Sequence, residues 1–442
     1  MALAVAAAVS PAAEPTTSVD LSHGKLQISA DGRHLVHADG TPFFYLGDTA
    51  WELFHRLNRE EADLYLGDRA AKGFTVIQAV VLAELDGLHT PNAYGELPLE
   101  NDDPRQPNEA YFRHVDYIVD KAESLGMFIG MLPTWGDKWN KKWGVGPEIF
   151  TPDNAAAYGE FLGRRYRDKP IIWILGGDRN PENDQHLAII RAMARGLKKG
   201  DGGNHLMTFH PQGGSGSSQW FHNDDWLNFN MFQSGHSAAN APNYRTLLKN
   251  YGLKPAKPVL DGEPRYEDHP IDWKPQNGWF DEWDVRQAAW WSMLSGACGH
   301  TYGNHNIWQM WQPGRKPISS ARTPWKTAVK HPGSAQVGYM RKLLESKAWQ
   351  KLVPDEDLLA GEPGEGAEHI RAARAGDGSF AMIYTPTGKT LSVRRERIGR
   401  KVNASWFDPR TGKLKPAQAD GQSFDPPGEP GRGNDWVLVL ER

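Results

Sequence analysis

Cysteine is almost absent from this chain of 442 residues, in which Cys298 stands alone. A single thiol excludes a disulfide within the chain and a thiolate zinc site, and its apolar neighbours in the sequence predict an inert buried group. Long apolar runs are also lacking. Beyond the N-terminus no stretch approaches the roughly 20 apolar residues that span a bilayer, so we expect a soluble protein with no membrane partner.

An excess of charge of one sign is missing as well. The chain has 50 Lys and Arg residues against 54 Asp and Glu residues, a net charge of −4, and no long single-sign run. This balance argues against a nucleic-acid partner. Tryptophan, by contrast, is abundant, with 18 residues. Most of these should be core residues, but the flat apolar face of an indole, with a polar N–H at its edge, also suits the C–H-rich faces of sugars.

The N-terminal segment, residues 1–19, combines an apolar stretch with small residues near a plausible cleavage point. It lacks the basic residues that open a signal peptide. We interpret it as an export-signal remnant or a disordered N-terminus, and we expect a periplasmic or secreted monomer.

Residues 20–350 show the pattern of an α/β fold, a (β/α)8 TIM barrel. Short strands with turn dipeptides in residues 20–42 predict a hairpin that closes the bottom of the barrel. Apolar runs then alternate with amphipathic helices, the first of which Asn58 and Glu61 should cap. Eight such alternations favour a closed barrel over an open sheet. The expected strands are residues 43–48, 74–81, 127–132, 171–178, 206–210, 227–231, 259–263 and 299–302.

The pattern changes at about residue 351, where the helical period disappears. Short alternating strands separated by Gly and Pro fill residues 351–442. This arrangement is typical of a small antiparallel β-sandwich, with residues 408–412 as a turn between two of its strands. We therefore predict a barrel followed by a separate sandwich domain.

Two acidic residues end two of the barrel runs: Asp178 the fourth and Glu263 the seventh. The carboxyl ends of barrel strands form the catalytic face, so these acids can converge on one cleft. Hydrolysis of a glycosidic bond needs such a pair, with one acid kept protonated and one ionised. The alternative is that each acid pairs with a nearby arginine, Arg179 or Arg265.

Further polar and aromatic residues are expected at the same face, as the wall of a sugar pocket. They are Asp48, Trp51, Gln78, Trp135, Trp139, His210, Gln212, Gln233, Tyr302, His305 and Trp308. Trp135, Trp139 and Trp143 recur every four residues, so a helical stripe packed on the barrel is an equal alternative for these three. His34 and His37 form a lone His-x-x-His pair, and without a third ligand we expect no metal and no cofactor.

Four motifs occur in order at strand ends, in residues 46–55, 73–81, 173–180 and 261–266. Together they resemble the apiosidase-like glycoside hydrolases of family 140, over most of residues 25–345. The resemblance implies a (β/α)8 barrel with a C-terminal β-sandwich and retaining hydrolysis of a terminal β-linked apiofuranose. It also implies Asp178 as acid/base and Glu263 as nucleophile.

One departure concerns the fourth strand, where many barrel glycosidases carry Asn-Glu and this chain has Gly177–Asp178. The shorter Asp must lie closer to the bond that it protonates. We expect a retaining glycosidase that releases apiofuranose, or a similar furanose, from pectin side chains or plant glycosides, with carbohydrate as its partner. The alternatives are a glycosidase of the same scaffold acting on an arabinofuranose, a galactofuranose or a glucan, and a catalytically silent carbohydrate-binding protein. A metal-dependent hydrolase is disfavoured because no His-x-His follows the first strand.

Overall fold

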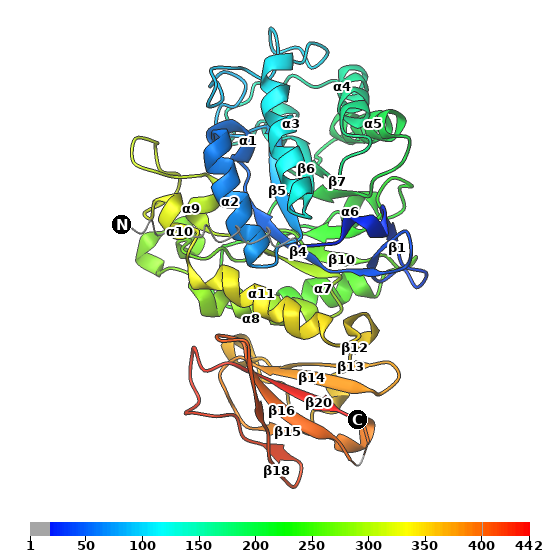
Figure 1. Cartoon of the computed structure of the whole chain (residues 1–442), viewed down its shortest axis with the longest axis vertical. Helices are drawn as coiled ribbons and strands as arrows, with labels where there is room; N and C mark the ends of the chain where they lie inside the picture. Colours follow the sequence, from blue (N-terminus) through cyan, green and yellow to red (C-terminus); the bar gives the residue numbers. More distant parts are fainter. Residues whose placement is uncertain (1–17, 400) are drawn as a thin grey trace, which may run out of the picture.

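Eight parallel strands form the centre of the larger domain (Figure 1). The computed structural model describes residues 18–399 and 401–442, so residues 1–17 of the predicted export signal lie outside the described residues. In chain order the strands are β4 (Tyr45–Thr49), β5 (Val76–Leu82), β6 (Phe128–Thr134), β7 (Ile171–Gly176), β8 (Met207–His210), β9 (Asn230–Phe232), β10 (Val259–Asp261) and β11 (Gly299–Tyr302). Six of them pair in the order β11-β4-β5-β6-β7-β8, and β9 pairs with β10.

Two backbone hydrogen bonds join these two sets of strands. The N–H of Asn228, ahead of β9, donates to the carbonyl of Met207 in β8 (2.9 Å), and the N–H of Cys298, ahead of β11, donates to the carbonyl of Val259 in β10 (3.0 Å). The sheet therefore curls into a (β/α)8 barrel, as predicted. Cys298 is buried, which confirms the expectation for that thiol.

Helices surround the strands. They are α1 (Leu53–Arg56), α2 (Arg59–Ala71), α3 (Glu109–Ser124), α4 (Pro152–Arg165), α5 (Asp184–Asp201), α6 (Ser218–Phe221), α7 (Asn243–Tyr251), α8 (Glu282–Met293), α9 (His305–Trp308), α10 (Trp325–Ala328) and α11 (Pro332–Glu345). Asn58 and Glu61 cap α2 reciprocally, as predicted, because each side chain accepts a hydrogen bond from the backbone N–H of the other residue. In the described residues, no helix is both long and apolar enough to span a membrane.

The bottom of the barrel is covered by a small antiparallel sheet of β1 (Leu26–Ile28), β2 (Leu35–His37) and β3 (Pro42–Phe43). Its aromatic side chains seal the barrel, with the rings of Phe43 and Phe128 5.2 Å apart. The predicted hairpin is confirmed, with one strand more than expected. In the part of the chain that the structure describes, this end of the barrel is therefore covered, and the carboxyl ends of the strands form the end that ligands can approach.

The C-terminal domain consists of two antiparallel sheets. The larger has the order β12-β13-β14-β20-β16-β17 and the smaller β15-β19-β18. Their bounds are β12 (Leu352–Pro354), β13 (Arg371–Ala375), β14 (Phe380–Thr385), β15 (Leu391–Ser392), β16 (Asn403–Asp408), β17 (Lys413–Pro416), β18 (Ala419–Asp420), β19 (Ser423–Phe424) and β20 (Trp436–Glu441). The predicted turn at residues 408–412 closes with a hydrogen bond from the N–H of Gly412 to the carbonyl of Asp408 (2.8 Å).

Helices α8 and α11 lie between the barrel strands and the sandwich (Figure 1). Arg286 of α8 makes a bidentate, fully buried ion pair with Asp435 of the sandwich (2.9 and 2.7 Å) and also donates to the side-chain oxygen of Gln336 in α11 (2.7 Å). The indole N–H groups of Trp283 and Trp291 donate to the sandwich carbonyls of Pro386 and His369, each at 2.8 Å. The polar groups named here are paired, so a buried ion pair and several hydrogen bonds join the two domains.

Candidate active site

A cleft of about 610 Å³ opens at the carboxyl ends of the barrel strands. Eight of the residues predicted for the site line it: Trp51, Trp135, Asp178, Gln212, Gln233, Glu263, His305 and Trp308. They follow strands β4, β6, β7, β8, β9, β10 and β11, so loops from most of the barrel circumference contribute. The strand-end rule therefore brings residues separated by more than 200 positions into one cavity.

Asp178 sits on an unusual backbone segment. The φ angles of Gly176, Gly177 and Asp178 are 100°, 94° and 55°, all in the left-handed region. A side chain at Gly176 would collide with the carbonyl oxygen of His210, and one at Gly177 would lie 2.8 Å from the backbone nitrogen of Gly136. The sequence thus needs two glycines to turn the chain sharply at the end of β7, and Asp178 adopts a conformation that costs energy and is commonest at functional sites.

Arg179 contacts Asp178. An ion pair with this arginine was the alternative to a catalytic role for the acid. Its guanidinium donates to the Asp178 carbonyl (2.7 Å) and lies 3.3 Å from the Oδ2 atom. The Asp178 side chain nevertheless remains 23% exposed and faces the cleft, whereas the Arg179 side chain is 1% exposed. The arginine fixes the backbone of the acid without removing its carboxyl from the cavity.

Glu263 follows β10 by two residues and is held by two histidines. Nε2 of His236 lies 3.0 Å from Oε1, and Nε2 of His210 lies 3.1 Å from Oε2. Arg265 is not its partner, because that guanidinium is buried near Asp261 and Asp284 instead. The competing interpretation of an arginine pair therefore fails for Glu263.

His210 connects the two acids. Its Nδ1 atom accepts a hydrogen bond from the backbone N–H of Asp178 (3.3 Å). In a neutral ring the proton must then sit on Nε2, the atom that faces Glu263. The ring does not line the cleft itself, so this predicted substrate contact lies one layer behind the acids.

The pKa values of the two acids are pushed apart. Burial and the negative charge of Glu263 raise the pKa of Asp178 to about 7. Burial alone would raise the pKa of Glu263 too, but hydrogen bonding and favourable electrostatic interaction with His210 and His236 hold the pKa below its usual range. Such a pair can supply one protonated and one ionised carboxyl at the same pH.

Three predicted residues lie behind the cleft wall, where other groups of the protein bind their polar atoms. The carboxylate of Asp48 is fully buried against Arg69 and the hydroxyl of Tyr65. Gln78 accepts from the hydroxyl of Tyr45 (3.0 Å) and donates to the carbonyl of Gly262 (3.1 Å). The hydroxyl of Tyr302 donates to Glu267. These groups brace the strands that carry the acids, rather than facing the cleft.

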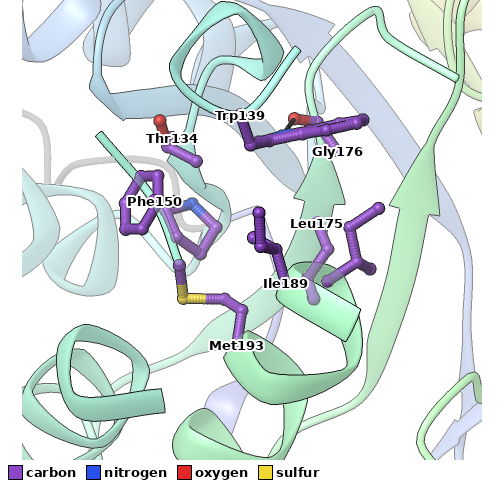
Figure 2. Close-up of a pocket in the computed structure, with 9 residues that line it drawn as sticks. Thr134, Trp139, Phe150, Leu175, Gly176, Ile189 and Met193 are labelled. Carbon is purple, nitrogen blue, oxygen red and sulfur yellow. Dashed lines mark hydrogen bonds between the residues drawn. The ribbon is translucent and has the colours of Figure 1, made fainter. Parts of the chain in front are cut away.

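Trp139 also lies away from the cleft. Its ring lies next to Gly176 and lines a separate small apolar cavity of about 20 Å³, with Phe150, Ile189 and Met193 (Figure 2). Trp135 lines the cleft, and Trp143 is 60% exposed at its edge. Between Trp135 and Trp143 the chain forms only a three-residue 3-10 helix, Gly136–Lys138. The helical stripe that the spacing of four residues suggested is therefore not formed.

Several cleft residues were not expected from the sequence: Glu84, His236, Tyr266, His269 and Trp273. Glu84 follows β5 by two residues, so the strand-end rule that selected Asp178 could have found it. Burial, together with the negative charges of Glu52 and Asp178, raises the pKa of Glu84 well above its ordinary range. The histidines and Trp273 lie in long loops, where no periodic pattern points to them.

Comparison with known proteins identifies the barrel. Residues 29–351 match the family model described as the catalytic domain of apiosidase-like proteins. The chain belongs to the apiosidase-like family. Residues 353–441 of this apiosidase-like protein match a second model, described as the putative collagen-binding domain of a collagenase. No curated protein matches the chain.

Solved structures agree with the family. One described as a glycoside hydrolase is 36% identical, with a TM-score of 0.88 over 96% of this chain and 98% of that chain. Another, described as a family 5 glycoside hydrolase from Bacteroides vulgatus ATCC 8482, is 33% identical, with a TM-score of 0.89 over 96% and 95%. A third from the same organism, at 16% identity and a TM-score of 0.64, supports the fold alone. The apiosidase-like protein is thus a glycosidase.

Proposed function

We propose that this apiosidase-like glycosidase releases a terminal β-linked apiofuranose, or a similar furanose, from pectin side chains or plant glycosides. The observation that carries the proposal is the pair Asp178 and Glu263, two carboxyls in one cleft with pKa values displaced in opposite directions. Substrates of this kind lie outside the cell, in keeping with the predicted periplasmic or secreted location.

The proposed reaction is a double displacement with retention of configuration. Glu263 attacks the anomeric carbon while Asp178 gives its proton to the departing glycosidic oxygen, which leaves a glycosyl ester on Glu263. Asp178, now ionised, takes a proton from water as the water oxygen attacks the same carbon. Glu263 departs as a carboxylate, and both acids return to their starting states.

The contacts of each acid support this division of roles. Glu263 meets histidine nitrogens on both oxygens, which favours the ionised form that a nucleophile needs. Asp178 is partly buried and lies near a second carboxylate, which favours the protonated form that a general acid needs. If the roles were reversed, Glu263 would have to be protonated where its surroundings favour ionisation, and Asp178 would have to be ionised where its surroundings favour protonation.

The floor of the cleft suits a small sugar ring. Trp51 and Trp135 lie with ring centroids 5.4 Å apart, and the Trp51 ring stands edge-on to His210 at 5.3 Å. Both indoles are almost fully buried, so each presents only a small apolar area beside the acids. Gln212 and Gln233 add amide groups to the wall, which can bind sugar hydroxyls.

Product analysis tests the proposal. The wild-type protein is incubated with an apiose-bearing pectin side chain and with a flavonoid apioside, and NMR follows the released sugar and its first-formed anomer. We expect free apiose that appears first as the β-anomer. Release of the α-anomer first would contradict double displacement, and cleavage of arabinofuranosides, galactofuranosides or glucans in its place would reassign the sugar. Binding without release of any sugar would favour a silent carbohydrate-binding protein.

A further inference from the structure

The cleft is larger than a terminal furanose requires. Its volume of about 610 Å³ lies within the range of pockets that enclose drug-sized ligands, roughly 300–1,000 Å³. A single pentose is much smaller than such a ligand, so it would fill only part of the space. The remainder must hold either solvent or more of the substrate.

Two exposed tryptophans lie at this cleft. Trp143 is 60% exposed and Trp273 is 50% exposed, whereas the other tryptophans of the described chain are buried or half-buried. A single exposed indole on a surface needs no explanation. Here, however, both exposed indoles line the same cavity, which marks it as a surface for an apolar partner.

The two indoles enter the cleft from opposite sides. Trp143 lies in the loop after β6, the third barrel strand, and Trp273 in the loop after β10, the seventh. Strands three and seven of an eight-stranded barrel are half a circumference apart. The deeply buried Trp51 and Trp135 occupy the floor beside the acids, so the exposed pair belongs to the mouth of the cleft.

Trp143 is backed by a fixed cation. The guanidinium carbon of Arg179 lies 3.9 Å from the centroid of the Trp143 ring, and Nζ of Lys142 lies at 5.5 Å. Arg179 is itself buried and bound to the carbonyls of Asp178 and Asn140. This stacking holds the ring in place although more than half of the residue is exposed to solvent.

Trp273 is held at the expense of backbone strain. The φ angles of Asp272 and Trp273 are 55° and 58°, two successive non-glycine residues in the left-handed region. The Trp273 ring stands edge-on to His236 at 6.0 Å and to His269 at 5.8 Å. Since such strain persists mainly where function requires a geometry, an indole that projects into solvent from a strained turn indicates a ligand contact.

We propose that Trp143 and Trp273 are stacking platforms for the sugar units on the leaving-group side of the scissile bond. This inference rests on the proposed function, because it assumes that the terminal furanose occupies the floor. The enzyme then selects a furanose borne on a saccharide chain over one borne on a simple alcohol. Each platform binds the C–H-rich face of one leaving-group sugar, at some distance from the reacting atoms.

The test compares two substrates with the same terminal sugar. One is methyl β-apiofuranoside, whose leaving group has no ring, and the other is an apiose-bearing pectin side-chain oligosaccharide. We expect Trp143→Ala and Trp273→Ala each to lower kcat/KM on the oligosaccharide about tenfold, mainly through KM. On the methyl glycoside the same variants should stay within about twofold of wild type. Val145→Ala, an exposed residue on the loop of Trp143, serves as the matched control and should change neither.

Equal losses on both substrates would overturn the inference, because the indoles would then support the floor or the fold. Wild-type activity that is confined to another furanoside would reassign the sugar, and the same comparison would be run with the methyl glycoside and a chain bearing that sugar. If the wild type cleaves no glycoside, the proposed function fails. Calorimetric titration of pectin oligosaccharides then decides separately: weaker binding by both variants supports the platforms, and unchanged or absent binding rejects them.

Discussion

The cleft and the junction between the two domains differ in how far their polar groups are paired and buried. At the junction the buried charge of Arg286 has Asp435 and Gln336 as partners, and the indole N–H groups of Trp283 and Trp291 each have an acceptor. In the cleft, Asp178 sits on a strained backbone and keeps a partly exposed carboxyl. Paired groups give rigidity, whereas exposed and strained groups leave interactions that a substrate can complete.

The largest effect should come from Glu263, the most tightly held acid of the cleft. We expect Glu263→Gln to lower kcat by more than about a thousandfold, because an amide cannot act as the nucleophile. Thermal unfolding should change little, because the amide keeps the size of the side chain. Steady-state kinetics and calorimetry measure the two effects, and more than about a tenth of wild-type kcat would reject the nucleophile assignment.

Asp178 should show a large effect that depends on pH. Because the protonated acid is the active form, kcat/KM should fall as the pH rises through the pKa of about 7. Asp178→Asn should remove this alkaline limb and lower kcat by about 100- to 10,000-fold on a sugar leaving group. A nitrophenyl furanoside is the control substrate, because its leaving group needs no proton and glycosylation should be less impaired. An alkaline limb that persists in the variant would assign that pKa to another group.

Substitutions at the junction should change the free energy of unfolding rather than the catalytic rate. Arg286→Ala leaves the buried carboxylate of Asp435 without its partner, which should lower the free energy of unfolding by about 3–5 kcal/mol. The matched control is Lys351→Ala, which breaks the exposed pair with Asp377 and should cost at most about 1 kcal/mol. Denaturant titration measures both. A small loss in both variants would show that the buried ion pair contributes little to the stability of the junction.

His236 should give the smallest of these effects. His236→Phe removes a partner of Glu263, so the pKa of that acid should rise toward its usual range. Since the ionised form is active, the acidic limb of kcat/KM should move to higher pH, with several-fold lower activity at about pH 4. His236→Gln can still donate to the carboxylate and should restore part of the wild-type profile. An acidic limb of kcat/KM at the same pH in the wild type and both variants would show that His236 does not influence the ionisation of Glu263.

Much of the barrel follows from the sequence because strand ends and helix caps have local signals. Asn58 and Glu61 mark the start of α2, and the run of apolar residues marks β7. The sixth strand is shifted from residues 227–231 to Asn230–Phe232, because its first apolar residues belong to the approach to the strand. In the sandwich, all four residues of β17 are exposed, so this strand has no apolar alternation that the sequence could reveal.

The site was harder to predict, for a physical reason that Asp48 illustrates. Asp48 and Asp178 both stand at or near strand ends, yet an arginine 21 positions away buries Asp48 completely, whereas Asp178 keeps a partly exposed carboxyl beside its neighbour Arg179. Sequence pattern places a carboxyl at the correct edge of the sheet but does not say which distant side chain will neutralise it. His236 and Trp273 depend in the same way on loop conformations that no periodicity encodes.

The two glycines ahead of Asp178 have a practical consequence for engineering. Because neither position accepts a side chain, the backbone that carries the proton donor Asp178 has a fixed position and direction. Libraries that seek new specificities should therefore leave residues 176–178 unchanged, keep Trp135 and Glu263, and randomise the more distant parts of the loops after β6 and β10, around Trp143 and Trp273. Those parts of the loops can be altered or extended without moving the Asp178 carboxyl. Preference for the leaving group should therefore be able to change while the bond-cleaving step is preserved.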